Sequence, residues 1–106
     1  MTDAEPSLDD SQVVIAIDAG TTGVRARAVF ARAGADAPRI HSYLEFEQHF
    51  PQPGWVEHDA EEIWTCVRTA LLDVIGRLPD GVGSVAAIGI TNQRETVVAW
   101  NRRTGE

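Results

Sequence analysis

The sequence contains no lysine, and all nine of its basic residues are arginine. A Walker-type phosphate loop requires a Gly-Lys-Ser/Thr sequence, so this stretch cannot provide one. Any contact with a phosphate group must therefore come from backbone N–H groups, hydroxyls, arginine or a metal ion. The arginine excess itself is most simply explained by genomic base composition.

Cysteine is nearly absent, since Cys66 is the only one. An internal disulfide is excluded, and a reducing compartment is the default expectation. The N-terminus lacks the pattern of a secretory signal, and no apolar run approaches membrane-spanning length. We therefore expect a cytoplasmic protein with no membrane partner.

Positive charge is scarce as well, and the formal net charge is -7 over 106 residues. Residues 1–12 contain four acidic residues and no basic one, together with Pro6 and Ser7, which predicts a disordered acidic tail. The remainder is mildly acidic, which argues against a nucleic-acid partner. An apolar fraction of 43% and a charged fraction of 24% are typical of one small globular domain.

Hydrophobic patterning predicts three strands in the first half of the chain. Residues 13–17 form a continuous β-branched run, which is typical of a strand buried on both faces. Residues 24–30 alternate between apolar and polar, as a hairpin strand with one exposed face does. A third strand is expected within residues 39–47.

A single helix is expected next, followed by two further strands. Asp59 is the predicted N-cap, Glu62 completes a capping box, and the helix should end near Arg77. Strands are then expected over 85–90 and 96–100. The predicted apolar stripe of the helix consists of Ile63, Trp64, Val67, Leu71, Val74, Ile75 and Leu78.

The resulting order is β-β-β-α-β-β, which differs from the strict alternation of a doubly wound nucleotide-binding sheet. It suits the ribonuclease-H-like core of actin-type ATPases, in which the first hairpin turn holds phosphate. The predicted fold class is α/β, as an incomplete N-terminal subdomain of that kind.

The first chemical motif is "IAIDAGTTGVRA", residues 15–26. Asp18 lies where a strand emerges, a usual place for a metal-associated carboxylate. The turn from Gly20 to Gly23 can aim successive N–H groups at an anion, and Thr21 and Thr22 add hydroxyls. The alternative is a plain glycine hairpin turn whose N–H groups bond to Asp18.

The second motif is "NQRE", residues 92–95. Arg94 offers a planar fork of donors and Glu95 offers acceptors, and the hydroxyls of a polyol or sugar can use both. A surface ion pair of little energetic value explains the pair equally well.

The third motif is "FPQPGWVEHD", residues 50–59. Trp55 suits either ligand stacking or anchoring of the loop. Capping is a sufficient explanation for Asp59, and His58 beside it is expected to be structural, so we assign no catalytic role here. The serines lack a nucleophile-elbow context, and no zinc-ligand spacing occurs.

These three motifs, in this order and at this spacing, resemble the N-terminus of the FGGY carbohydrate kinases, most closely the members that phosphorylate glycerol. The matching strings are "VVIAIDAGTTGVRARAVF", "EFEQHFPQPGWVEHDAEEIW" and "AAIGITNQRETVVAWNRRTGE", which cover most of residues 13–106. The strings "PGWVEHD" and "GITNQRET" are highly specific, whereas the Asp-x-Gly-Thr-Thr string is shared with actin and heat-shock chaperones.

The resemblance implies ATP and Mg²⁺ as cofactors and a small polyol as substrate. Asp18 would lie near Mg²⁺ and the transferring phosphoryl group. Thr22 and Arg25 would lie at the phosphate end of the cleft, with Gly20, Thr21 and Gly23 in the same turn. Arg94 and Glu95 would bind the hydroxyls of glycerol. Ala19, Gly23 and Val24 depart from the glycerol-type turn toward that of other FGGY sugar kinases.

Members of this family are several times longer than 106 residues. The resemblance therefore implies that residues 13–106 are the N-terminal part of kinase domain I, truncated before the catalytic base, and inactive on their own. Another FGGY sugar or polyol kinase and a short non-catalytic actin-like binding module are the alternatives. The oligomeric state, a homo-oligomer included, is left open.

Overall fold

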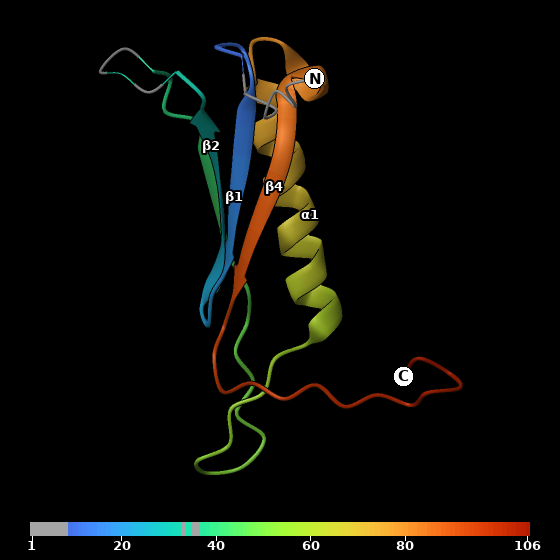
Figure 1. The fold of residues 1–106 in the computed structure, drawn as a ribbon. Helices are drawn as coiled ribbons and strands as arrows, with labels where there is room; N and C mark the ends of the chain where they lie inside the picture. The colour runs from blue at the N-terminus through green and yellow to red at the C-terminus, as the bar shows by residue number, and fades with distance from the viewer. Residues whose placement is uncertain (1–8, 33, 35–36) are drawn as a thin grey trace.

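The computed structural model describes residues 9–32, 34 and 37–106, so most of the expected acidic tail lies outside the described residues. Four strands form one sheet in the order β3-β2-β1-β4 (Figure 1). β1 pairs antiparallel with β2 and parallel with β4, and β2 pairs antiparallel with β3. The elements are β1 (Val13–Ala19), β2 (Gly23–Phe30), β3 (His41–Glu45), α1 (Ala60–Arg77), the short 3-10 helix η1 (Gly81–Ser84) and β4 (Val85–Asn92).

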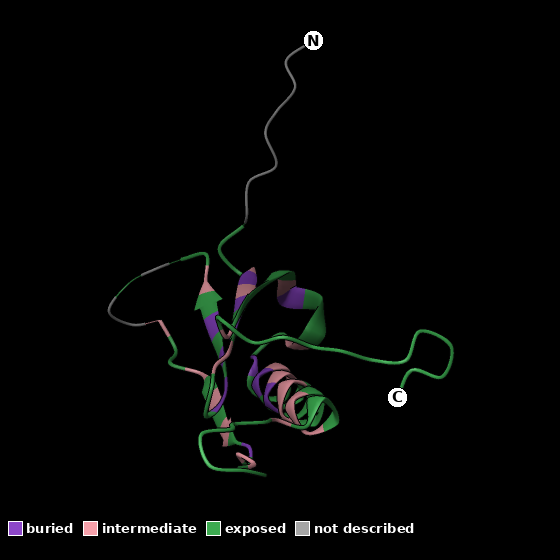
Figure 2. Cartoon of the chain, turned by 90° about the horizontal axis from the view of Figure 1, so that it is seen from below, coloured by how far each residue is buried: buried purple, intermediate pink, exposed green. Residues whose placement is uncertain are grey.

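The core lies between α1 and one face of the sheet. The register pairs Ile15 with Ala28 and Ile17 with Ala26, so these alternate residues share the face that α1 covers. Figure 2 shows the buried side of α1 turned toward the strands. Full burial of a side chain such as Ile15 or Val74 stabilises the fold by about 1.5–3 kcal/mol.

The prediction that the first strand is buried on both faces is wrong. Ala16 and Asp18 are exposed, whereas Val13, Ile15 and Ile17 are buried. The reason is that α1 packs on one side of β1, β2 and β3, and no other helix covers the opposite face within the described part of the chain. The alternation predicted for β2 is confirmed, with Arg25 and Arg27 on the exposed face.

The strand predicted over 96–100 does not form. β4 is the last strand of the sheet, and the chain beyond it runs away from that sheet (Figure 1). Without a neighbouring strand, a β-prone segment has no ladder to join, and Val97 is 90% exposed. The predicted order is therefore correct only as far as β4, with η1 added before it.

The helix begins and ends where the sequence indicates, and Asp59 is its N-cap, accepting a hydrogen bond from the Glu61 N–H at 2.9 Å. The predicted capping box does not form, because the Glu62 side chain binds residues outside the helix. Its Oε1 accepts from the Glu47 N–H at 2.8 Å, and its Oε2 lies 3.6 Å from His49 Nε2. Glu62 thus ties the loop after β3 to the helix.

The apolar stripe of α1 is confirmed except at Trp64, which is 59% exposed. The buried line passes through Ala70 and Val74, and Trp64 lies on its flank. None of the helices described is both long and apolar enough to cross a bilayer.

Candidate functional site

The hairpin turn between β1 and β2 is closed by a hydrogen bond from the Gly20 N–H to the Gly23 carbonyl at 2.9 Å. The N–H groups of Thr21 and Thr22 make no hydrogen bond within the described residues, so they remain available to an anion. A Cβ at Gly20 would lie 3.8 Å from Asp18 Oδ1, which places this carboxylate over the turn. The turn therefore offers two free N–H donors beside one carboxylate.

Gly23 has a separate structural role. A Cβ there would lie 2.5 Å from the Leu44 carbonyl oxygen and 2.8 Å from Cζ and Oη of Tyr43. β3 thus packs directly on the backbone of Gly23, which only glycine permits. Thr22 is held by the same neighbour, with its Oγ1 3.2 Å from Tyr43 Oη.

Arg25 is exposed on β2, and its side chain extends over β3 and away from the turn. Its Cζ lies 4.7 Å from the centre of the Tyr43 ring, and its Nη1 lies 3.5 Å from His41 Nδ1. Asp18 is opposite Arg25 in the register, but the two form no ion pair. In this structure the guanidinium contacts Tyr43 and His41.

The segment after β4 folds into a tight turn. Thr96 Oγ1 donates to Gln93 Oε1 at 2.7 Å, and Glu95 adopts a left-handed backbone with φ 58°. That region costs a non-glycine residue about 1–2 kcal/mol. Backbone strain of this kind is often found at functional sites, which makes Glu95 a candidate site residue.

Gln93 joins this turn to the β1–β2 hairpin. Its Nε2 donates to the Gly20 carbonyl at 3.3 Å across 73 positions of sequence. The contact is possible because β1 and β4 are parallel neighbours, and the register places Ala19 beside Asn92. The hairpin motif and the "NQRE" motif therefore lie together at the end of the sheet where β1 and β4 both terminate.

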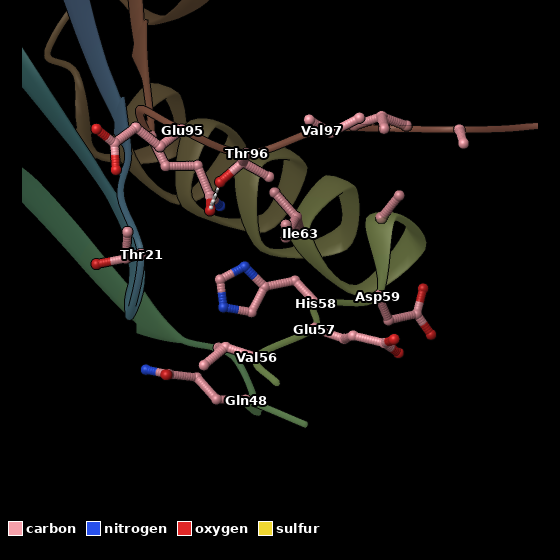
Figure 3. Close-up of a pocket in the computed structure, with 14 residues that line it drawn as sticks. Thr21, Gln48, Val56, Glu57, His58, Asp59, Ile63, Glu95, Thr96 and Val97 are labelled. Atoms are coloured by element: carbon pink, nitrogen blue, oxygen red, sulfur yellow. Dashed lines mark hydrogen bonds between the residues drawn. The ribbon is translucent and has the colours of Figure 1, made fainter. Parts of the chain in front are cut away.

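One open concavity of about 690 Å³ contains residues from all three sequence motifs. Thr21 and Glu95 lie toward one end of it, Asp59 lies at the other, and the His58 ring stands between them (Figure 3). Gln93, Thr96 and the apolar side chains of Val56 and Ile63 complete its polar and apolar walls. A small molecule with several hydroxyls and an apolar carbon chain suits such a lining.

The predicted site residues are distributed unevenly around this concavity. Thr21 and Glu95 line it, whereas Asp18, Gly20, Thr22, Gly23, Arg25 and Arg94 do not. Arg94 is exposed, and its carbonyl accepts from Thr96 Oγ1 at 3.4 Å.

Three residues of this region were not singled out from the sequence. Gln93 and Thr96 build the turn around Glu95, and Tyr43 supports both Thr22 and Arg25. Gln93 belongs to the "NQRE" motif and could have been recognised from it. No sequence pattern marks Tyr43, because only the pairing of β2 with β3 places it beside Thr22 and Arg25. His58, expected to be structural, packs edge-on to Phe46 with ring centres 5.0 Å apart.

A magnesium ion brought in with a nucleotide fits this arrangement. The described residues contain no group of three or more potential metal ligands, so they form no closed protein cage. Mg²⁺ is commonly held by one or two carboxylates together with water and substrate phosphates. Asp18, exposed above the turn, can supply one such carboxylate.

Comparison with known proteins agrees with this geometry. The family model described as the FGGY family of carbohydrate kinases, N-terminal domain, matches residues 13–106. A glycerol kinase of Symbiobacterium thermophilum is 50% identical over 93 residues, covering 88% of this chain and 18% of that protein. A glycerol kinase of Klebsiella pneumoniae is 44% identical over 99 residues, covering 93% of this chain and 19% of that protein.

The fold is shared with a solved structure as well. The crystal structure of Plasmodium falciparum glycerol kinase with ADP matches 90% of this chain and 19% of its own, with a TM-score of 0.72 and 36% sequence identity. The chain thus spans less than a fifth of the length of these relatives. With the family model matching nearly the whole sequence and the actin-like sheet in place, the chain belongs to the FGGY family of carbohydrate kinases.

Proposed function

We propose that this chain forms one wall of the active site of an ATP-dependent glycerol kinase, which converts glycerol and ATP to glycerol 3-phosphate and ADP. One observation carries the proposal: Thr21, the segment 56–59 and the turn at Glu95 line a single concavity although they are far apart in sequence. The relatives named glycerol kinase support this choice of substrate.

The β1–β2 hairpin forms the phosphate side of the proposed site. The free N–H groups of Thr21 and Thr22, with their hydroxyls, bind phosphate oxygens, and Gly20 and Gly23 shape the turn. Asp18 would hold Mg²⁺, directly or through water, and is the one proposed catalytic residue in this chain. Arg25 joins this set by turning from Tyr43 toward the hairpin.

The turn after β4 forms the polyol side. Glu95, which lines the concavity, accepts hydrogen bonds from substrate hydroxyls, and Arg94 donates to them after rotating inward. The two sides are close because β1 and β4 are parallel neighbours, and Gln93 links them by donating to the Gly20 carbonyl. A hydroxyl held at Glu95 thus faces the hairpin that would hold the transferring phosphate.

Phosphoryl transfer depends on many groups that position the substrates and stabilise charge. The described residues provide one open wall, and we expect residues 1–106 alone to show no turnover. We also propose a cytoplasmic location, because these 106 residues contain a single cysteine, as is usual in a reducing compartment.

A thermal-shift experiment tests the substrate assignment on the protein expressed from its complete reading frame. Glycerol at about 100 times its Kd should stabilise the folded state by about 2.7 kcal/mol and raise Tm by several degrees. Glu95→Gln should lower the shift at the same glycerol concentration to about half or less and keep the MgATP shift. The control Arg102→Gln, at an exposed position, should keep both.

Three other outcomes would count against the assignment. A larger shift with another polyol or a sugar would identify a different FGGY kinase. A shift with MgATP and none with any polyol would favour the non-catalytic actin-like module. If saturating glycerol and MgATP together shift nothing in a folded protein, the kinase proposal fails.

A further inference from the structure

Three arginines gather on the sheet face opposite α1, around β2 and the start of β3. Arg25, Arg27 and Arg39 line a concavity of about 360 Å³ together with Ile40 and His41. The register explains the position of the first two, because it pairs Arg25 with Tyr43 and Arg27 with His41, and paired residues project to the same face. Arg39 lies two residues before β3 begins and lines the same concavity. The three arginine side chains are exposed.

The cluster is unusual in a chain of net charge -7. The ion pairs of the described residues are Arg77 with Asp73 and His49 with Glu62, so none of the three guanidiniums has a carboxylate within 4.0 Å there. Like charges on adjacent strands repel one another. An anion bound between them would remove that repulsion.

Neighbouring aromatic rings hold part of the cluster in place. Arg25 lies over the Tyr43 ring, with its Cζ 4.7 Å from the ring centre, and its Nη1 donates to His41 Nδ1 at 3.5 Å. In this structure Arg25 is directed toward His41, while Arg27 and Arg39 make no side-chain hydrogen bond within the described residues. The cluster combines one oriented guanidinium with two that can close on a ligand.

We propose that this concavity binds a phosphate-type anion, at a site distinct from the hairpin turn proposed for ATP. Guanidinium groups match phosphate oxygens with paired, charge-assisted hydrogen bonds, and several guanidiniums around one pocket suit a multiply charged anion. Arg25 belongs to both the proposed ATP site and this anion site, whereas Arg27 and Arg39 belong only to the anion site. The site does not require the kinase proposal, so each can fail without the other.

Calorimetric titration of the protein from its complete reading frame with inorganic phosphate tests the site. The double variant Arg27→Gln/Arg39→Gln should raise the Kd at least tenfold, because both mobile guanidiniums are removed. Arg68→Gln, an exposed arginine on α1, is the matched control and should leave the Kd unchanged. Added sodium chloride should weaken binding in the wild type, because the contact is between exposed charges.

A second experiment distinguishes a lipid headgroup from a dissolved anion as the ligand. Cosedimentation with phosphatidylcholine vesicles that contain a phosphoinositide would indicate a lipid headgroup, and titration with free phosphate would indicate a dissolved ligand. Loss of either interaction in the double variant supports the site. Phosphate binding that survives the double variant but is lost in Thr21→Val places the anion at the hairpin and overturns the proposal, as does the absence of binding in both arms.

Discussion

Replacing Glu95 by glutamine should raise the KM for glycerol by about 10–100-fold, because each charge-assisted hydrogen bond to a hydroxyl contributes about 1.5–3 kcal/mol. Glutamine keeps the length of the side chain and removes its charge. The measurement is steady-state kinetics with glycerol varied at saturating MgATP. Arg94→Ala should raise the same KM in a similar range, because it removes the donor half of the pair.

The backbone of Glu95 supplies a control with opposite effects on stability and affinity. Glu95 has φ 58°, so Glu95→Gly should relieve about 1–2 kcal/mol of strain and raise the free energy of unfolding. The same variant should lose glycerol affinity, since the carboxylate is gone. If Glu95→Gln and Arg94→Ala both keep a near-wild-type KM, the polyol assignment of this turn is wrong.

Gly23→Ala should lower the free energy of unfolding by about 3 kcal/mol, the upper end of what overpacking commonly costs. The new Cβ would lie 2.5 Å from the Leu44 carbonyl oxygen, which is backbone and cannot move without disturbing the β2–β3 pairing. Urea unfolding, with the change read from the midpoint at constant m, measures the loss.

The matched control is a glycine with open space around it. Gly76 lies in α1, and a Cβ there would meet nothing within 4 Å. Gly76→Ala should therefore stabilise the protein by about 1 kcal/mol, the difference in helix propensity. Equal effects of the two substitutions would show that β3 does not pack on Gly23 as described.

Local signals in the sequence were enough to predict most of the elements. The β-branched run of β1, the alternation of β2 and the N-cap Asp59 each act within a few residues, and the structure confirms the strands and helix that they predict. Two of the wrong predictions, the last strand and the capping box, have non-local causes. The segment 96–100 has strand-forming residues but no neighbouring strand, and Glu62 accepts a hydrogen bond from the Glu47 N–H instead of from the helix N-cap.

The candidate site depends on contacts that no local pattern contains. Thr21 and Glu95 lie close together because β1 and β4 are adjacent and parallel, and sequence order alone does not specify that pairing. His58 reaches the same concavity from the segment before α1, where its ring packs on Phe46. The resemblance to the FGGY carbohydrate kinases also implies that these segments belong to one site. The contacts of Tyr43 with Thr22 and Arg25 depend on the β2–β3 register, which the sequence alone does not specify.

The most direct test is a coupled assay of ADP formation by the protein expressed from its complete reading frame. We predict ADP formation that requires glycerol and Mg²⁺, with glycerol 3-phosphate as the second product. Asp18→Asn should lower kcat by about 100-fold or more, the loss that follows removal of a group stabilising transition-state charge. Absence of glycerol-dependent ADP formation in the folded protein, or full activity of Asp18→Asn, would contradict the proposal that this chain is one wall of a glycerol kinase active site.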